Sequence, residues 1–307
     1  MLVELEQCNC RTGIFHINAC VPSLADDVSC TSTSPKTSQC MLDVCNEYSR
    51  KWCFRFNAKT SYILQFSLSP PEKNLIYNWH IGDDKIPSSD NCCHLGIEMN
   101  SRFKATERTT NACRKGRNAF FAINGIMSKS TKPCILVKLY KSVVLPTVLY
   151  GCEMWNNLKS VDLTNLNRFQ HFIVKRIQNL RTCTRSDMCQ SLLGIHPISS
   201  YIDTRKLLFL QKLCSLDDIF LAKRIFMTKL FSYFADNSWK QFGFISDIIE
   251  ILYHYELSDY LVEYLLEGRF PPKQLWKSIV YGAVNETHAN ECIVVIAYIV
   301  WQWFHSI

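Results

Sequence analysis

The hydrophobic periodicity of this 307-residue chain changes near Asn100, and that change limits the folds open to it. Before Asn100, short apolar or alternating runs are separated by Gly, Pro, Asn and Asp, the pattern of β-strands joined by turns. From Arg102 to Leu266, apolar residues recur with a period near 3.6, the pattern of amphipathic helices. We therefore expect an α+β fold in which β-hairpins and one helix come first and a mainly helical region follows.

The composition indicates a folded and mildly basic protein. Apolar residues make up 48% of the chain and the formal net charge is +7, a balance that argues against disorder. A chain of this length fits two domains, or one domain with a long appendage. We expect three parts: residues 1–100 with the strands, residues 101–215 with basic helices, and residues 216–307 with further helices and an apolar tail.

The apolar tail extends from Cys292 to Phe304. It is shorter than the ~20 residues that a membrane-spanning helix needs. We therefore favour a buried terminal helix or strand over a membrane anchor.

The sixteen cysteines are scattered and lack the repeated Cys-x-x-Cys spacing of a zinc site. Residues Met1 to Asn9 include acids and no apolar run, so no secretory signal is expected. Reduced thiols in a cytoplasmic or nuclear compartment are predicted.

Short patterned runs predict the elements of the first hundred residues. Ile14 to Val21 and Val28 to Thr33 are rich in β-branched or small residues, which predicts the two strands of a hairpin. A helix with an apolar stripe is expected from Ser34-Pro35 to about Lys51. Further strands are predicted at Trp52–Phe56, Tyr62–Phe66, Ile76–Ile81 and Cys93–Met99.

Helical signals dominate after Asn100. Helices are predicted from Arg102 to Phe121 and from Pro133 to Leu145, with a kink or restart at Pro146. Ser200-x-x-Asp203 has the form of a capping box, and a helix from Phe244 to Leu266 is expected to end at Gly268. Another helix buries one face formed by Leu163, Leu166, Phe169, Ile173, Ile177 and Leu180.

Asp26 and Asp27 are predicted to lie at the tip of the first hairpin. Two carboxylates held side by side repel each other unless a cation neutralises them, and polymerases bind catalytic magnesium in this way. The pair alone does not identify a metal site, because Asp-Asp also occurs at residues 83–84 and 217–218.

Several segments follow the acidic pair in a recognisable order: the helix before Lys51, then Asn57-Ala58-Lys59, His94-Leu95-Gly96, Leu139 to Pro146, and Tyr150 to Trp155. In this order and spacing, the chain resembles the C-terminal part of the reverse transcriptase (RNA-directed DNA polymerase) of non-LTR, LINE-type retrotransposons. The resemblance covers about residues 15 to 215. It implies the end of a polymerase palm followed by a thumb-like helical region.

The resemblance implies roles for four residues. Asp26 and Asp27 would be two of three catalytic carboxylates and would bind Mg²⁺. Lys59 would meet the triphosphate charge or assist as an acid, and Gly96 would allow the primer strand to approach the backbone. The alternatives remain open that Lys59 is a solvated turn lysine and that Gly96 only relieves crowding in a strand. His94 stands where the family usually has an aromatic residue.

Basic residues are concentrated between Ser101 and Lys141, where Glu107 is the single acid. Lys104, Arg108 and Lys115 fall on one face of the predicted helix, which suits the backbone of an RNA/DNA template–primer duplex. The alternative is a solvated basic helix. The residues predicted to contact nucleic acid are Gly96, Arg102, Lys104, Arg108, Arg114, Lys115, Arg117, Lys138 and Lys141.

A second basic group is weaker evidence for nucleic-acid binding, because its members are more dispersed. Phe169 and Phe172 lie beside it at core spacing, so base stacking is not indicated. The group consists of Arg168, Lys175, Arg176, Arg181 and Arg185.

In the family, a further catalytic aspartate and the template-contacting fingers lie well upstream of the acidic pair, whereas twenty-five residues precede Asp26 here. We therefore expect a truncated reverse transcriptase, inactive alone, whose remaining role is template–primer binding. Two alternatives are a non-enzymatic nucleic-acid-binding helical protein, and a helical interaction or membrane-associated protein that uses the apolar tail.

The purified chain should not extend a templated primer with Mg²⁺ or Mn²⁺, because loss of one of three metal-bridging carboxylates costs orders of magnitude in rate. A primer-extension assay on an RNA or DNA template measures this. Extension that disappears in the Asp26→Ala variant would contradict the expectation.

Overall fold

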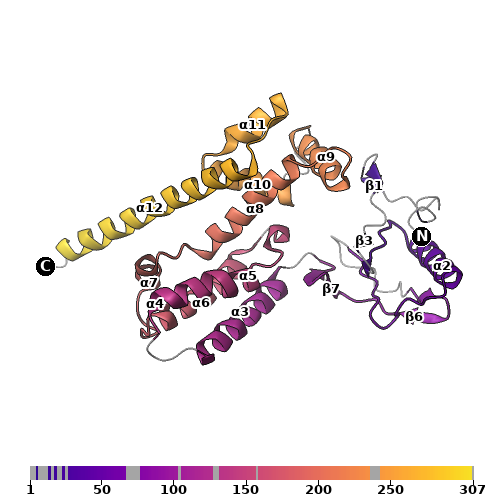
Figure 1. Cartoon of the computed structure of the whole chain (residues 1–307), viewed down its shortest axis with the longest axis horizontal. Helices are drawn as coiled ribbons and strands as arrows, with labels where there is room; N and C mark the ends of the chain where they lie inside the picture. The colour runs from indigo at the N-terminus through magenta and orange to yellow at the C-terminus, as the bar shows by residue number, and fades with distance from the viewer. Residues whose placement is uncertain are drawn as a thin grey trace. The chain divides into compact units, whose positions relative to one another are not determined.

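The computed structural model (Figure 1) describes residues 27–66, 77–102, 105–126, 131–156, 158–235 and 243–305, together with Leu5 and the pairs 13–14, 17–18 and 23–24. The chain divides into two units. The first, here called the strand unit, comprises Met1–Lys104 and Asp218–Thr228, and the second, the helical unit, comprises Ala105–Asp217 and Lys229–Ile307. All strands among the described residues belong to the strand unit, and the fold is α+β.

Four antiparallel strand pairs form in the strand unit. The first two are short: β1 (Gly13–Ile14) with β2 (Ile17–Asn18), and β3 (Ser23–Leu24) with β4 (Asp27–Val28). The longer pairs are β5 (Trp79–Ile81) with β6 (Asp84–Ile86), and β7 (Asn91–His94) with β8 (Ile97–Asn100). Each pair is a local hairpin, so the unit has no extended sheet among the described residues.

Helix α2 (Pro35–Lys51) confirms the helix predicted after Ser34. The Ser34 side chain accepts a hydrogen bond from the Thr37 amide at 3.2 Å, and Pro35 occupies the first turn, where its missing N–H costs nothing. Met41 and Cys45 face the β5–β6 hairpin. With its partners this face forms the core of the strand unit: Leu5, Met41, Cys45, Trp79, Ile81 and Ile86.

The strands predicted at 52–56 and 62–66 are wrong. Cys53 has a φ of 53°, and the Phe54 amide donates to the Ser49 carbonyl at 3.0 Å, so the chain turns back onto the end of α2. Amides bonded to a helix end are not free for a ladder. The second segment makes one isolated bridge, between Ile63 and Ser88.

The pairing predicted for the first hairpin is also wrong. Gly13–Ile14 pairs with Ile17–Asn18, which closes a separate local turn, and Val28 pairs with Ser23. Short-range pairing closes a smaller loop than pairing of residues 14–21 with 28–33 and costs less entropy.

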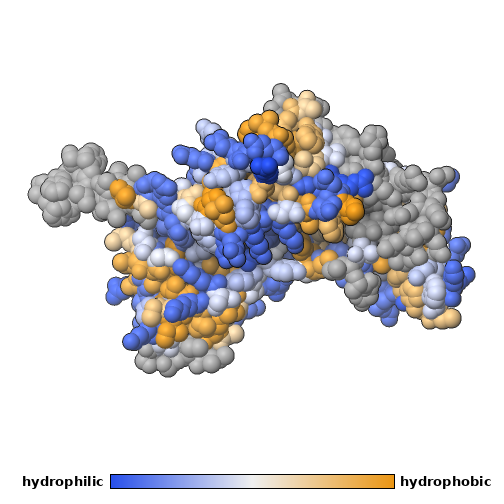
Figure 2. Space-filling model, turned by 45° about the horizontal axis from the view of Figure 1, so that its top comes forward, coloured by the Kyte–Doolittle hydropathy of each residue, from blue (hydrophilic) through white to orange (hydrophobic). Residues whose placement is uncertain are grey.

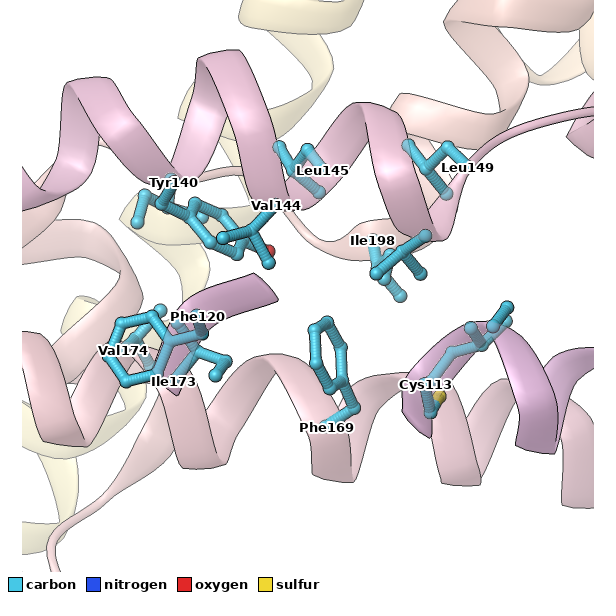
Figure 3. Packing of buried hydrophobic residues seen from close by; sticks show 14 of the residues in the cluster. Cys113, Phe120, Tyr140, Val144, Leu145, Leu149, Phe169, Ile173, Val174 and Ile198 are labelled. Carbon is cyan, nitrogen blue, oxygen red and sulfur yellow. The ribbon is translucent and has the colours of Figure 1, made fainter. Parts of the chain in front are cut away.

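The helical unit is built on α3 (Thr106–Ile126) and α6 (Ser160–Ile177), which pack against each other and against α5 (Leu145–Val148) (Figure 1). Leu166, Phe169 and Ile173 of α6 are fully buried, which confirms the main part of the predicted face, whereas Leu180 lies beyond the helix and is exposed. Figure 3 shows this core, whose members include Cys113, Phe120, Tyr140, Val144, Leu145, Leu149, Phe169, Ile173, Val174 and Ile198.

The helix interruption expected at Pro146 takes the form of a π-helical turn. Helix α4 (Pro133–Leu139) continues into η1 (Tyr140–Val144) and then into α5. The Leu145 amide donates to the Tyr140 carbonyl, five residues back. Pro146 has no N–H, so it cannot make the backbone hydrogen bond to the preceding turn. The wider π-helical turn just before it lets the helix continue without that bond.

Two shorter elements complete the first half of the helical unit and lead into α8 (Ile198–Cys214). A 3₁₀ turn, η2 (Cys152–Met154), precedes α6, and α7 (Ser186–Leu193) precedes α8. The predicted capping box at Ser200 is wrong. Helix α8 has already begun at Ile198 after Pro197, and the Asp203 carboxylate accepts a hydrogen bond from the Tyr255 hydroxyl at 3.1 Å.

The remaining helices are α9 (Leu221–Ala235), α10 (Phe244–His254), α11 (Ser258–Glu267) and α12 (Lys273–His305). A single helix over residues 244–266 is therefore wrong. Glu256 has a φ of 56°, and the Leu257 amide donates to the Leu252 carbonyl at 2.8 Å, which ends α10. The predicted stop at Gly268 is confirmed, because Gly268 is left-handed at a φ of 70° and caps α11.

The apolar tail belongs to α12, so the helical alternative for residues 292–304 is confirmed for the backbone. Its predicted burial concerns side chains that lie, apart from Ile293, outside those described. Within the part of the chain that the structure describes, no helix combines the length and apolar character needed to cross a membrane.

A buried ammonium links three distant segments of the helical unit. Lys206 is 3% exposed, and its Nζ donates to the Trp155 carbonyl at 2.8 Å and to Asp247 Oδ2 at 2.6 Å. A buried charge is tolerated only when it is paired and hydrogen-bonded. This contact therefore holds the segment around Trp155 against α8 and α10.

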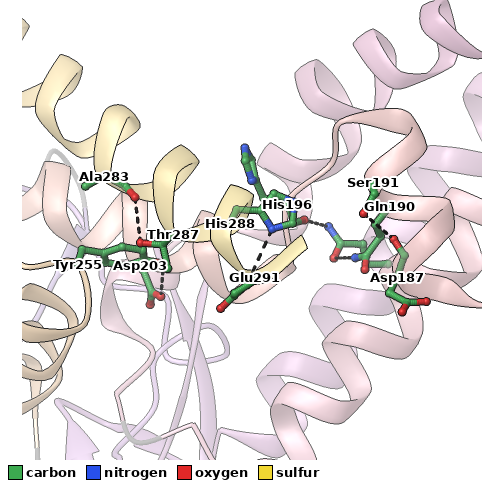
Figure 4. Close-up of polar contacts among 11 residues, drawn as sticks. Asp187, Gln190, Ser191, His196, Asp203, Tyr255, Ala283, Thr287, His288 and Glu291 are labelled. Carbon is green, nitrogen blue, oxygen red and sulfur yellow. Dashed lines mark hydrogen bonds and ion pairs between the residues drawn. The ribbon is translucent and has the colours of Figure 1, made fainter. Parts of the chain in front are cut away.

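His171 and His196 are two half-buried histidines of the helical unit. The His196 ring lies edge-on to His288 of α12, with centroids 4.5 Å apart, and the His196 carbonyl accepts from Gln170 (Figure 4). Burial lowers the pKa of His196, and the neighbouring His288 and Lys141 lower it further. Burial also lowers the pKa of His171, assisted by Lys175. In the folded protein the neutral form of His171 and of His196 is therefore favoured.

Gly116→Ala should destabilise the protein. A Cβ at Gly116 would collide with Val148 Cγ2 and lie 2.8 Å from Phe169 Cζ. Overpacking of this kind costs about 1–3 kcal/mol, more than the helix propensity that alanine gains. Gly125→Ala is the matched control in the same helix, because its Cβ would meet nothing within 4 Å. The melting temperature should fall in Gly116→Ala and rise in Gly125→Ala, relative to the wild type. Equal melting temperatures of the two variants would contradict the close packing at Gly116.

Acidification should destabilise the helical unit through His171 and His196. Their folded pKa values lie below the ordinary 6.5, so the unfolded chain binds protons first. Stability is therefore complete above about pH 6.5 and falls as the pH drops through that value toward the folded pKa. Melting temperatures are measured at about pH 7.5 and about pH 5.5. The decrease on acidification should be smaller for His196→Gln than for the wild type or for exposed His254→Gln. A decrease in melting temperature as large in His196→Gln as in the wild type would contradict a role of His196 in the acid destabilisation.

Candidate nucleic-acid interface

The predicted catalytic pair is described only at Asp27. Asp26 lies outside the described residues, and Asp27 is an exposed residue of β4 whose Cα partner is Leu24. Ser29 Oγ, just after β4, lies 3.1 Å from His94 Nε2 at the end of β7. The fold therefore brings the acidic strand beside the β7–β8 hairpin, two segments that are 65 residues apart.

Gly96 lies in a turn and not in a strand, so the single strand predicted over 93–99 is wrong, and its two ends belong to β7 and β8. Leu95 and Gly96 connect β7 to β8 with φ values of 51° and 76°. Two successive residues with positive φ are what a tight hairpin of type I′ requires, and glycine adopts this conformation without strain. The turn itself therefore explains the glycine.

Lys59 is an exposed residue of a local turn. Its amide donates to Asn57 Oδ1 at 3.1 Å, and the Thr60 amide donates to the Asn57 carbonyl at 3.1 Å. An asparagine that bonds the backbone two residues on stabilises such a turn by itself. The segment shared with the resemblance is thus a turn organised by Asn57, with the Lys59 side chain toward solvent.

The predicted nucleic-acid contacts fall in different places. Arg102 is exposed in the turn after β8, Lys104 lies outside the described residues, and Lys138 is exposed on α4. Lys141 donates to the Gly194 carbonyl at 2.8 Å, at the C-terminal end of α7. Arg108 is half-buried and donates to the Met154 carbonyl at 3.2 Å. Arg108 and Lys141 thus already serve as donors to backbone carbonyls.

The basic residues of α3 lie on two flanks, so the single face predicted for this helix is incomplete. Thr109, Gly116 and Phe120 mark the buried stripe. With 100° per residue, Arg108 and Lys115 lie on one side of this stripe, and Arg114 and Arg117 lie on the other. The flank of Arg114 and Arg117 borders α6.

A cluster of arginines and phenylalanines forms where this flank meets α6. The Arg117 and Arg176 guanidinium carbons lie 5.8 and 5.5 Å from the centre of the Phe172 ring, within cation–π range. The Phe121 ring is 6.0 Å from Phe172. Exposed Arg114 lies one helical turn before Arg117 on α3, and exposed Arg168 lies one turn before Phe172 on α6. We call this the α3–α6 basic cluster: Arg114, Arg117, Phe121, Arg168, Phe172 and Arg176.

Few acids oppose this charge. Residues 105–182 contain 13 Lys or Arg and three acids, so this stretch is more positive than the whole chain. Glu153 pairs with Arg205 at 3.5 Å, and buried Asp162 accepts hydrogen bonds from Thr109 and from the Lys159 amide. Figure 2 shows hydrophilic side chains among hydrophobic ones on the face that it draws.

No group of three or more His, Cys, Asp or Glu side chains that could hold a metal ion occurs among the residues described. The magnesium pair predicted at Asp26 and Asp27 includes a residue outside that set, so it stays a prediction.

No family model matches the chain, and no curated protein or solved structure is significantly similar to it.

The sequence did not reveal the aromatic part of the cluster. Phe172, expected in the core, packs half-buried against it and has two guanidinium groups within 6 Å of its ring centre. Phe121 is 50% exposed. The available signal was the spacing Arg168-x-x-x-Phe172-x-x-x-Arg176, which puts cations one turn on each side of an aromatic ring.

Proposed function

We propose that the helical unit binds nucleic acid through the α3–α6 basic cluster. The observation that carries the proposal is four arginines on two adjoining helices, with no carboxylate of the described residues paired to Arg117, Arg168 or Arg176. Uncompensated guanidinium groups attract a polyanion, and planar guanidinium forks match phosphate oxygens.

Phosphate is the partner that this charge pattern suits best. A duplex presents one negative charge per about 1.7 Å of its axis, so several arginines can each neutralise a phosphate and release its counterions. Because α3 and α6 run alongside each other, their arginines line a stretch of surface along both helices.

The resemblance to LINE-type reverse transcriptases supports an RNA/DNA template–primer as that ligand. On this proposal the strand unit is the end of a palm and the helical unit is thumb-like. The Ser29–His94 contact supports it, because it joins the acidic strand to the hairpin that carries Gly96. Asp26 and Asp27 would hold Mg²⁺, with two-metal phosphoryl transfer as the family chemistry, while this chain alone is proposed to bind without polymerising.

Arg114→Gln/Arg168→Gln should weaken binding of a labelled RNA–DNA duplex. Each lost phosphate contact makes the slope of log affinity against log salt less steep by about 0.9. The slope of the double variant should therefore be about 1.8 less steep than that of the wild type. Fluorescence anisotropy from low to physiological salt measures this. The matched control is Arg269→Gln/Lys273→Gln, which removes two exposed cations near the start of α12.

Wild-type binding that is independent of salt, or an equal loss in both double variants, would contradict the assignment of the cluster. Melting temperatures of both variants, compared with the wild type, separate loss of binding from loss of folding.

A further inference from the structure

We infer that the α3–α6 basic cluster also binds an unpaired nucleotide, whose base stacks on Phe121. This inference rests on the proposed function and extends it from duplex to single-stranded RNA or DNA. It concerns a different interaction, because phosphate contacts need only charge, whereas stacking needs an accessible aromatic face.

Phe121 provides such a face. Its ring contacts Phe120 at 5.9 Å and Phe172 at 6.0 Å between centroids, at angles of 66° and 57°. Phe120 is buried at 3% exposure, whereas Phe121 is 50% exposed. Phe120 meets the Phe121 ring edge-on and Phe172 is tilted to it. Half of the Phe121 surface stays open to a ligand without rearrangement of the core.

Phe172 holds the cations that a nucleotide needs beside its base. Arg117 lies on α3 and Arg176 on α6, and both guanidinium groups lie within 6 Å of the Phe172 centroid. The ring thus positions one cation from each helix near Phe121. A phosphate can pair with either guanidinium while its base lies on the phenyl ring, as in surfaces that bind single strands.

An unpaired strand fits this arrangement better than a duplex does. Bases inside a duplex stack on one another and present only their edges, so a lone phenyl ring cannot reach a base face there. A single strand, an overhang or a loop exposes base faces. The site should therefore prefer single strands, with little dependence on base identity because every base has a π-face.

The test compares Phe121→Ala with Phe121→Tyr, measured by anisotropy on single-stranded DNA, single-stranded RNA and a blunt duplex of equal length. Phe121→Ala should weaken single-strand binding about 5- to 150-fold, the range for one base–aromatic stack, and weaken duplex binding by a clearly smaller factor. Phe121→Tyr should retain both, since it keeps the ring. Phe231→Ala, an exposed phenylalanine on α9, is the matched control.

The outcomes separate the two proposals. Unchanged single-strand binding in Phe121→Ala, with Arg114→Gln/Arg168→Gln still impaired, would overturn the stacking site and leave the proposed function standing. Equal loss on duplex and single strand in Phe121→Ala would also overturn it. Loss on RNA or DNA alone would support stacking and identify the polymer. Wild-type-like binding of every ligand by the arginine variant would refute the proposed function.

Discussion

The absence of a side chain at Gly116 sets the geometry on which the helical unit depends. Val148 and Phe169 occupy the space that a Cβ would take, so α3 approaches α5 and α6 closely. Arg117, the next residue on α3, reaches the ring of Phe172, which lies one turn after Phe169 on α6. The cluster is therefore a consequence of core packing: the same contact that fills the interior brings surface groups of two helices together.

Some of the positive charge of the chain is used internally. Arg108 donates to the Met154 carbonyl and Lys206 to the Trp155 carbonyl, so adjoining peptide groups of one turn are bonded by cations from α3 and α8. The segment Tyr150 to Trp155 is one of those that carry the resemblance. In the structure it is where two helices anchor, and its buried Trp155 and Cys152 belong to the core.

Sequence reasoning succeeded where one local signal dominates. Helix α2 has a side-chain cap and a proline in its first turn, and α6 has a clean apolar stripe. It failed where backbone conformation is set by non-glycine residues of positive φ, at Cys53, Leu95 and Glu256, because no composition rule marks them. The candidate site was predicted in part: charge density identified α3, but which flank faces α6 depends on packing that a single helix does not encode.

The buried Lys206 has a consequence for how the chain assembles. Its ammonium must find a carbonyl from residue 155 and a carboxylate from residue 247, partners separated by more than ninety positions. With either one missing, the desolvated charge would be left partly unmatched. Segments before and after α8 are therefore interdependent, and a fragment ending ahead of α10 would lack the Asp247 counterion that Lys206 of α8 relies on.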